Sequence, residues 1–241
     1  MISLLTCTGD RPRLFKRLEG WMARQSLEWT NWIVVDDGTR PTTCTLGQRH
    51  IRLEPGLSPS ASFARNLEVG LREQARLGGS DFVFFIEDDD WYGPHHLASL
   101  WIALTRHELV GESFSRYYNV SELSYHFCSN ANHAALCATA IRATLIPQIV
   151  SLIDERDIYF DRRIWRRLDC SKHLQPTRHC VGLKGQAGRP GLGWGHRPSN
   201  FIPDPQAIVL KEWLGGDASD ALKHALNPRP RTSAATGIVQ T

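Results

Sequence analysis

Four acidic residues stand side by side in this chain, Glu87, Asp88, Asp89 and Asp90, directly after an apolar run at 82–86. Neighbouring carboxylates repel one another, and burial beside a sheet strengthens the repulsion. A hard divalent cation relieves it, because Mg²⁺ takes carboxylate oxygens together with substrate phosphates. The run therefore predicts a metal site among these carboxylates, with a helix cap at Asp90 as the structural alternative.

A second acidic pair, Asp36 and Asp37, precedes Gly38 at the end of a β-rich run at 32–35. Glycine lets the backbone approach a ligand, and carboxylates at such a turn can accept hydrogen bonds from ribose hydroxyls or a base. An Asp-Asp-Gly turn is common by itself. The turn indicates ligand binding only if the fold places it beside the other polar strand ends.

The glycine-rich basic stretch VGLKGQAGRPGLGWGHRP occupies residues 181–198 and contains Lys184, Arg189 and His196. Backbone N–H groups of glycines can reach phosphate oxygens, and basic side chains add charge-assisted hydrogen bonds. No Ser or Thr follows the lysine, so the stretch is not a Walker loop. It predicts a lid over a diphosphate, with a plain surface loop as the alternative.

The elements that position these residues follow from periodicity. Apolar runs at 2–5, 32–35 and 82–86 predict strands, and apolar spacing predicts helices at 12–25 and 62–77. This alternation implies a mainly parallel sheet, in which ligands bind beyond the carboxyl ends of the strands. The polar sequences that end the three strands should therefore meet in one crevice.

The pattern loosens in the second half of the chain. A helix is expected at 95–104, strands at 109–120 and 133–139, and a helix from about residue 142. Residues 216–241 are polar, and we expect them to form a partly disordered tail.

The composition is that of an ordinary globular protein, with 41% hydrophobic and 22% charged residues among 241. No apolar run approaches the roughly 18 residues that span a bilayer, and no signal-peptide pattern opens the chain. We therefore expect a cytoplasmic protein with no membrane partner.

Six cysteines without a C-x-x-C pair suggest reduced, mostly buried thiols rather than a zinc site or a disulfide framework.

Four motifs occur in order, ISLLTCTGDR, IVVDDGT, ARNLEVG and FFIEDDDWYGP. Together they resemble the nucleotide-sugar half of GT-A glycosyltransferases, close to family two, over about the first hundred residues. The resemblance implies a single α/β domain of Rossmann-like GT-A type, a divalent cation (Mn²⁺ or Mg²⁺) and a nucleotide-sugar donor linked to uridine diphosphate. The resemblance assigns the metal to Asp89, which stands in place of the family's second aspartate, and to its neighbour Asp90. Glu87 stands in place of the family's first aspartate, which leaves open which of Asp88, Asp89 and Asp90 holds the metal.

The resemblance also assigns residues to the donor. Thr6, Thr8 and Arg11 would line the nucleotide pocket, Asp36 or Asp37 would contact the base or ribose, and Arg65 would lie near the diphosphate. With the glycine-rich stretch included, the predicted donor-binding residues are Thr6, Thr8, Arg11, Asp36, Asp37, Arg65, Glu87, Asp88, Lys184, Arg189 and His196. The domain would cover residues 1–215, with a donor-binding half at 1–105 and an acceptor and lid half at 106–215.

An inverting transfer needs a general base beside the attacking hydroxyl. Wound as a helix, residues 157–169 place four arginines on one side and apolar residues on the other, with Asp161 on the apolar side. The position of Asp161 after the acidic motif resembles that of the base in family-two enzymes. We predict Asp161 as the base, with Asp157 in reserve, Glu112 as a weaker option, and helix capping as the structural alternative.

Nine Lys or Arg residues and a single acid, Asp169, lie between Arg162 and Pro203. This block favours a polyanionic partner such as DNA, with a merely solvated basic face as the alternative. The K-G-x-x-G-R-x-G-x-G-x-G-H pattern is similar to small phage-type glycosyltransferases of DNA, which implies 5-hydroxymethylcytosine as acceptor in a host cytoplasm. Predicted acceptor or DNA contacts are Arg116, Tyr117, Arg162, Arg163, Trp165, Arg166 and Arg167.

Two other functions remain compatible with these motifs. The same chemistry could act on a saccharide or protein hydroxyl. The chain could also be a non-catalytic module that binds a nucleotide or nucleic acid.

Overall fold

The computed structural model describes residues 1–56, 58–189, 191 and 200–225, and its largest element is a seven-stranded sheet. The strand order is β10, β6, β9, β4, β1, β2, β3. Only β9 runs antiparallel to its neighbours, so the sheet is mainly parallel, as predicted. The strands are Ile2–Thr8 (β1), Asn31–Asp36 (β2), Arg49–Arg52 (β3), Phe82–Phe85 (β4), Leu109–Glu112 (β6), Thr139–Arg142 (β9) and Lys172–Gln175 (β10).

A second sheet of five strands has the order β12, β8, β7, β11, β5. Its strands are Trp91–Tyr92 (β5), Phe114–Asn119 (β7), Ser124–Ser129 (β8), Cys180–Lys184 (β11) and Ile202–Pro203 (β12). The four acids at 87–90 connect β4 of the large sheet to β5 of the small one. The acidic run is therefore the corner between the two sheets.

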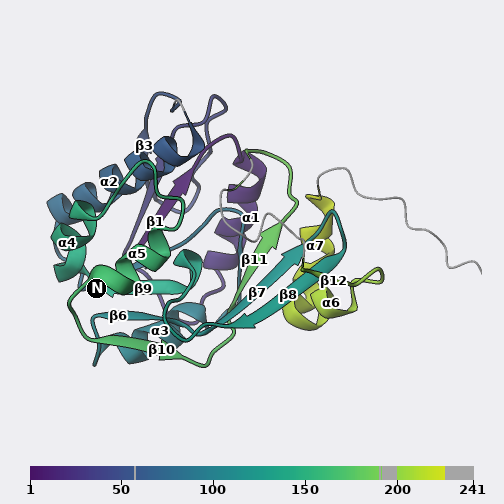
Figure 1. The fold of residues 1–241 in the computed structure, drawn as a ribbon. Coiled ribbons are helices and arrows are strands. Elements are labelled where there is room, and N and C mark those ends of the chain that lie inside the picture. Colours follow the sequence, from purple (N-terminus) through teal and green to yellow (C-terminus); the bar gives the residue numbers. More distant parts are fainter. Residues whose placement is uncertain (57, 190, 192–199, 226–241) are drawn as a thin grey trace, which may run out of the picture.

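Helices cover both faces of the large sheet because its strand residues alternate between two apolar cores. Leu4 and Phe84 belong to one core with α1 and α3, whereas Leu5 and Phe85 belong to the other with α2, α4 and α5. Figure 1 shows α2, α4 and α5 together on one side of this sheet, and α6 and α7 beside the small sheet. The helices are Pro12–Met22 (α1), Pro59–Leu77 (α2), His96–Leu104 (α3), Ile146–Ser151 (α4), Phe160–Arg167 (α5), Ile208–Leu214 (α6) and Ala218–Lys223 (α7).

Helix α2 illustrates how the sequence sets this packing. Ser58 caps it by accepting the N–H of Ala61, and Gly78 ends it with a φ of 63°. In the middle of the helix, a Cβ at Gly70 would lie 2.4 Å from Leu5 Cδ1. Glycine at this position therefore lets α2 lie close against β1.

Two sequence-based predictions differ from the structure. Residues 133–139 were expected to form a strand, but Leu136–Ala138 is a 3-10 helix (η1) and β9 begins at Thr139. The tail was expected to begin at residue 216, but η4 (Gly215–Asp217) and α7 occupy its first residues. Ala218 and Ala221 of α7 are buried in the first core.

Within the described part of the chain, none of the helices combines the length and apolarity needed to cross a bilayer.

His96 is a buried base in the middle of the fold. It has no exposed surface, and neither ring nitrogen has a hydrogen-bond partner among the described residues. Burial, with a smaller effect of His179, lowers the pKa of His96 to about 3. Its Nδ1 lies 3.9 Å from Glu112 Oε1, and burial raises the pKa of that carboxyl.

Lowering the pH from about 7 to about 4 should cost stability through His96, because the unfolded imidazole takes up a proton and the buried one does not. The contribution is fully present above the ordinary histidine pKa of about 6.5 and amounts to roughly a few kcal/mol. Because the pKa of Glu112 is raised, its contribution to stability grows as the pH falls, opposite to that of His96. His96→Leu should therefore flatten the histidine part of the pH dependence in urea unfolding, and identical slopes in both proteins would contradict this assignment.

Candidate active site

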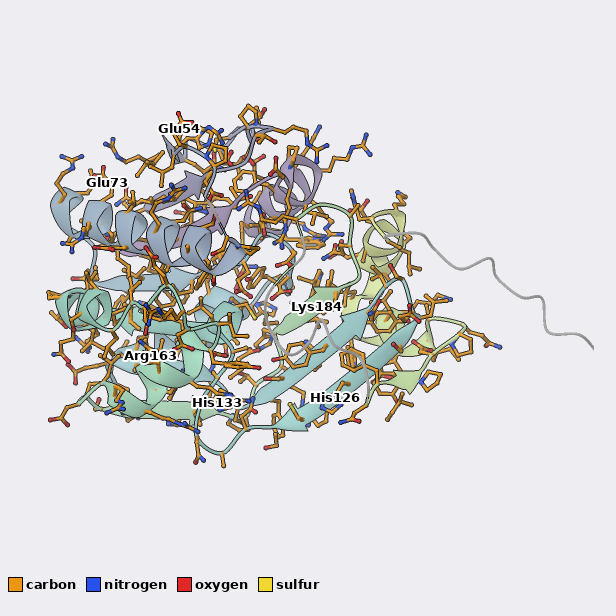
Figure 2. All side chains as sticks on the ribbon, turned by 45° about the horizontal axis from the view of Figure 1, so that its top comes forward. Glu54, Glu73, His126, His133, Arg163 and Lys184 are labelled. Atoms are coloured by element: carbon orange, nitrogen blue, oxygen red, sulfur yellow. The ribbon has the colours of Figure 1, made fainter. Side chains whose placement is uncertain are left out.

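A cavity of about 270 Å³ lies at the carboxyl ends of β1 and β4. The position agrees with the rule that ligands of open α/β sheets bind beyond the strand ends. Figure 2 labels two wall residues, Lys184 on β11 and His133 between β8 and β9. Polar residues on its walls include Thr8, Arg11, Asn66, Glu87, Asp88, Asp89, Asp90, Tyr117, Asn130, His133, Tyr159, Asp161, Arg162, Lys184 and Arg189.

The acidic corner is held by two cations of the chain. Arg11 Nη1 lies 2.7 Å from Asp88 Oδ1 and 3.1 Å from Asp89 Oδ2. Lys184 Nζ lies 2.9 Å from Asp90 Oδ1. When ionised, four carboxylates facing two cations leave two negative charges, which matches the charge of one divalent cation.

The pKa shifts at this corner reflect the same imbalance. Burial raises the pKa of Glu87 well above its usual value, and the charges of Asp90 and Asp89 add to the effect. Burial also raises the pKa of Asp88, although Arg11 opposes it. For Lys184, burial alone would lower the pKa, yet the carboxylates around it, first Asp90, raise it well above the usual range.

Three carboxylates of the corner fit a metal ion. Glu87, Asp89 and Asp90 each offer an oxygen, and these atoms lie within 4.8 Å of one another. Asp90 Oδ2 is buried and has no hydrogen-bond partner among the described residues, and a cation bound there would satisfy it. Helix α3 begins only at His96, with His95 at its N-cap, so Asp90 does not cap it.

Asp88 has a different environment. Its Oδ2 accepts the Thr8 hydroxyl at 2.6 Å, and Arg11 binds its other oxygen. Asp88 therefore fixes the end of β1 to the end of β4. Thr8 and Arg11 line the cavity, and their described contacts hold the acidic run in place.

Two predicted donor residues instead support the fold. Asp36 has no exposed surface, accepts the N–H groups of Gly38 and Thr42, and pairs with Arg52 at 2.7 Å. Thr6 is equally buried and accepts the Trp32 indole N–H. Neither residue lines the cavity, because both side chains point into the packed layers behind it.

Asp37 lies at the second strand end and is held by two arginines. Arg189 Nη1 is 2.7 Å from Asp37 Oδ1, and Arg65 Nη2 is 3.2 Å from Oδ2. Burial would raise the pKa of Asp37, but the hydrogen bonds from Arg189, Ser62 and Asn66 and the charge of Arg189 together outweigh it, so the pKa is lowered. Arg65 does not reach the cavity, whereas Arg189 lines it. Asp37 itself is fully buried and does not line the cavity.

Asp161 is the candidate base that faces the cavity. It lies in the first turn of α5, and its Oδ1 accepts the N–H of Arg162. Burial raises its pKa to about 6. The alternatives lie outside the cavity wall. Asp157 pairs with Arg163 at 2.6 Å, and Glu112 is buried and accepts N–H groups of His179 and Cys180.

Several predicted acceptor contacts are corrected. Trp165 is buried and donates to Thr139, and Arg163 pairs with Asp154 and Asp157. Arg116 is buried and donates to the carbonyls of Arg178 and Cys180. Trp165 and Arg116 are therefore closed to a partner on the surface, whereas Arg163 stays partly exposed beside its two acids.

The other predicted acceptor residues keep accessible positions. Tyr117 lines the cavity and packs against Gly182, where a Cβ would come within 2.6 Å of its ring. Arg162, Arg166 and Arg167 are exposed on α5. His196, predicted to bind the donor, lies outside the described residues.

Sequence reasoning missed several wall residues. His133 is half-buried, and burial followed by the charges of Arg162 and Arg166 lowers its pKa. Asn66, Asn130, Tyr159 and Cys137 also line the cavity. Asn66 belongs to the ARNLEVG motif, whereas the other missed wall residues belong to none of the four motifs, and only the folded chain brings them to the site.

Two searches by sequence gave no match. No protein-family model matches this chain, and no curated protein matches it.

Solved structures do match the fold. The complex of S. aureus TarS 1–349 with UDP-GlcNAc aligns with a TM-score of 0.53 and 14% identity, over 92% of this chain and 70% of that one. The UDP complex of the same fragment gives 0.51 at 14% identity, over 76% of this chain and 60% of that one. Mannosyltransferase PcManGT from Pyrobaculum calidifontis, bound to GDP-Man and Mn²⁺, gives 0.52 at 12% identity, over 75% and 56%.

These comparisons define the fold. The chain has the mixed α/β GT-A fold with a mainly parallel central sheet, as the sequence predicted. It spans about 60% of the UDP-bound TarS fragment.

Proposed function

We propose that this protein is a metal-dependent glycosyltransferase that moves a sugar from a nucleotide-diphosphate sugar, with uridine diphosphate as the first choice, to a hydroxyl group. The observation that carries the proposal is one cavity whose wall includes both the acidic run at 87–90 and Asp161. The fold is shared with proteins solved with UDP-GlcNAc and with GDP-Man and Mn²⁺.

The wall residues divide the chemistry between them. Asp161, with a pKa raised to about 6, would remove the proton of the attacking hydroxyl. Lys184 and Arg189 would contact the diphosphate that departs, and Asp37, predicted to contact the base or ribose, would instead hold Arg189 in place. Glu87, Asp89 and Asp90 would hold the divalent cation, which when bound supplies positive charge to the leaving diphosphate. Attack opposite the leaving group would invert the anomeric centre.

Uridine diphosphate with Mn²⁺ should raise the Tm of the protein, since a ligand that binds only the folded state stabilises it by about 2.7 kcal/mol at a hundred times its Kd. The test is thermal unfolding with UDP, GDP and their sugar conjugates, each with and without Mn²⁺. The nucleotide and the cation should stabilise more together than separately. If no member of the panel shifts the Tm, the donor-site proposal fails.

For the acceptor we propose the hydroxymethyl group of 5-hydroxymethylcytosine in DNA. Support comes from Arg162, Arg166 and Arg167, which are exposed on the helix whose first turn carries Asp161. Cations beside the base would bind backbone phosphates and hold a hydroxymethyl oxygen near it. A saccharide or protein hydroxyl is the alternative acceptor, and it gives no reason for this cationic face.

Replacing Arg162, Arg166 and Arg167 together by alanine should raise the KM for hydroxymethylated DNA at least about tenfold and reduce its salt dependence. A matched triple of equal charge, Arg13, Lys16 and Lys211→Ala, on α1 and α6, should leave KM nearly unchanged. Product formation is measured by mass spectrometry of digested DNA. Equal KM values for both triples, or transfer only to saccharides, would contradict DNA as the acceptor.

A further inference from the structure

Behind the acidic corner lies a second set of possible metal ligands, made of one carboxylate and two thiols. Asp90, Cys137 and Cys180 are all buried, and each offers a ligand atom within 4.8 Å of the others. They come from three segments, the corner before β5, the 3-10 helix η1 and the start of β11. Both cysteines are free thiols.

Asp90 has one oxygen that the chain leaves unsatisfied. Its Oδ1 accepts the Leu183 N–H at 3.0 Å and the Lys184 ammonium at 2.9 Å. Its Oδ2 is buried and has no hydrogen-bond partner within the part of the chain that the structure describes, and the whole side chain is only 1% exposed. A buried carboxylate oxygen without a partner is costly, and such an atom often marks an ion or water site.

We propose that Asp90, Cys137 and Cys180 bind a thiophilic divalent cation such as Zn²⁺ or Cd²⁺. On binding, each thiol gives up its proton to solvent, and two sulfur–metal bonds and one oxygen–metal bond form. Two thiolates and the carboxylate carry three negative charges. The divalent cation and the neighbouring Lys184 carry three positive charges, so the buried group is neutral.

Two of the three ligands line the cavity, so a fourth coordination position would face it. Asp90 and Cys137 line the cavity, whereas Cys180 lies behind it. Zinc sites with three protein ligands keep such a position for water or a ligand. A water or an oxygen of a ligand in the cavity would fill it.

Ligand type separates this site from the one at Glu87 and Asp89. Mg²⁺ and Mn²⁺ prefer oxygen ligands, whereas thiolates select Zn²⁺ and related soft cations. Because Asp90 faces both sets, a thiophilic cation would draw Asp90 to the sulfur side. This inference does not depend on sugar transfer, since cation binding alone tests it.

The experiment titrates the reduced full-length protein with Cd²⁺ and follows the ultraviolet charge-transfer band of cadmium thiolates. The expected result is saturation at one equivalent with release of two protons, and no loss of the band in excess Mn²⁺. Cys137→Ser and Cys180→Ser should each weaken the band and reduce the affinity. Cys7→Ser is the matched control, because Cys7 lines the same cavity but lies outside this set and should leave the titration unchanged.

Two results would overturn the site. One is the absence of a band at one equivalent of Cd²⁺, and the other is a band that survives both serine substitutions. Circular dichroism checks that the variants fold. If a variant does not fold, the site is judged from the wild-type protein alone, which should release two protons for each Cd²⁺ bound. Nucleotide binding with Mn²⁺ is measured separately, so failure here leaves the proposed transferase function untouched.

Discussion

Asp161→Asn should lower kcat for sugar transfer by about a hundredfold to ten-thousandfold, the usual contribution of a general base, with little change in donor affinity. Asparagine has nearly the same shape, and its carbonyl can still accept the N–H of Arg162 that Asp161 accepts. The substitution therefore removes the base without removing the contact that positions it. Single-turnover transfer and UDP binding, measured on the same preparation, separate the two effects.

Asp157→Asn is the matched control on the same segment. Asp157 lies outside the cavity wall and pairs with Arg163, so its loss should cost some stability and leave kcat within a few-fold. The opposite ranking of the two variants would make Asp157 the base. Unchanged activity in Asp161→Asn would favour a non-catalytic nucleotide-binding module.

The pH profile gives an independent check on Asp161. A base acts when deprotonated, so kcat/KM should rise with pH through about 6, where burial places the pKa of Asp161. An ordinary aspartate would give this rise near about 4. The Asp161→Asn variant should lose the rise, and a wild-type profile that is flat from about pH 5 to about pH 7 would contradict the assignment.

Much of the fold could be predicted because local pattern and burial agree. The runs at 2–5, 32–35 and 82–86 are strands that are buried on both faces, so continuous apolar sequence marks them clearly. Strand β9 was harder to place. It lies between β4 and β6 and runs antiparallel to both, and no local signal in residues 133–139 indicates that the strand begins only at Thr139.

The site was predictable only where a motif carries the chemistry. The acidic run and Asp161 do face one cavity, but sequence could not tell Asp36, which binds backbone N–H groups, from Asp37, which pairs with Arg189. Arg116 and Trp165 resembled surface contacts, yet tertiary packing buries both. Likewise Cys137 and Cys180 showed no ligand spacing in the sequence, because only the fold brings η1 next to β11.

Asp89→Asn should abolish the Mn²⁺-dependent part of nucleotide stabilisation and lower kcat by at least about a hundredfold, as expected for loss of charge stabilisation at a leaving group. Asp89 pairs with Arg11 and belongs to the possible ligand set together with Glu87 and Asp90. Removing its charge weakens cation binding, whereas the neutral amide keeps the shape of the corner.

Asp88→Asn provides the comparison one residue away. Asp88 is bound by Thr8 and Arg11 and does not belong to the ligand set, so its substitution should lower the Tm but preserve the response to Mn²⁺. The pair of variants also tests whether the two internal cations, Arg11 and Lys184, are enough without a metal. Full wild-type activity in the presence of a chelator, together with equal Mn²⁺ responses in both variants, would mean that these cations alone neutralise the diphosphate.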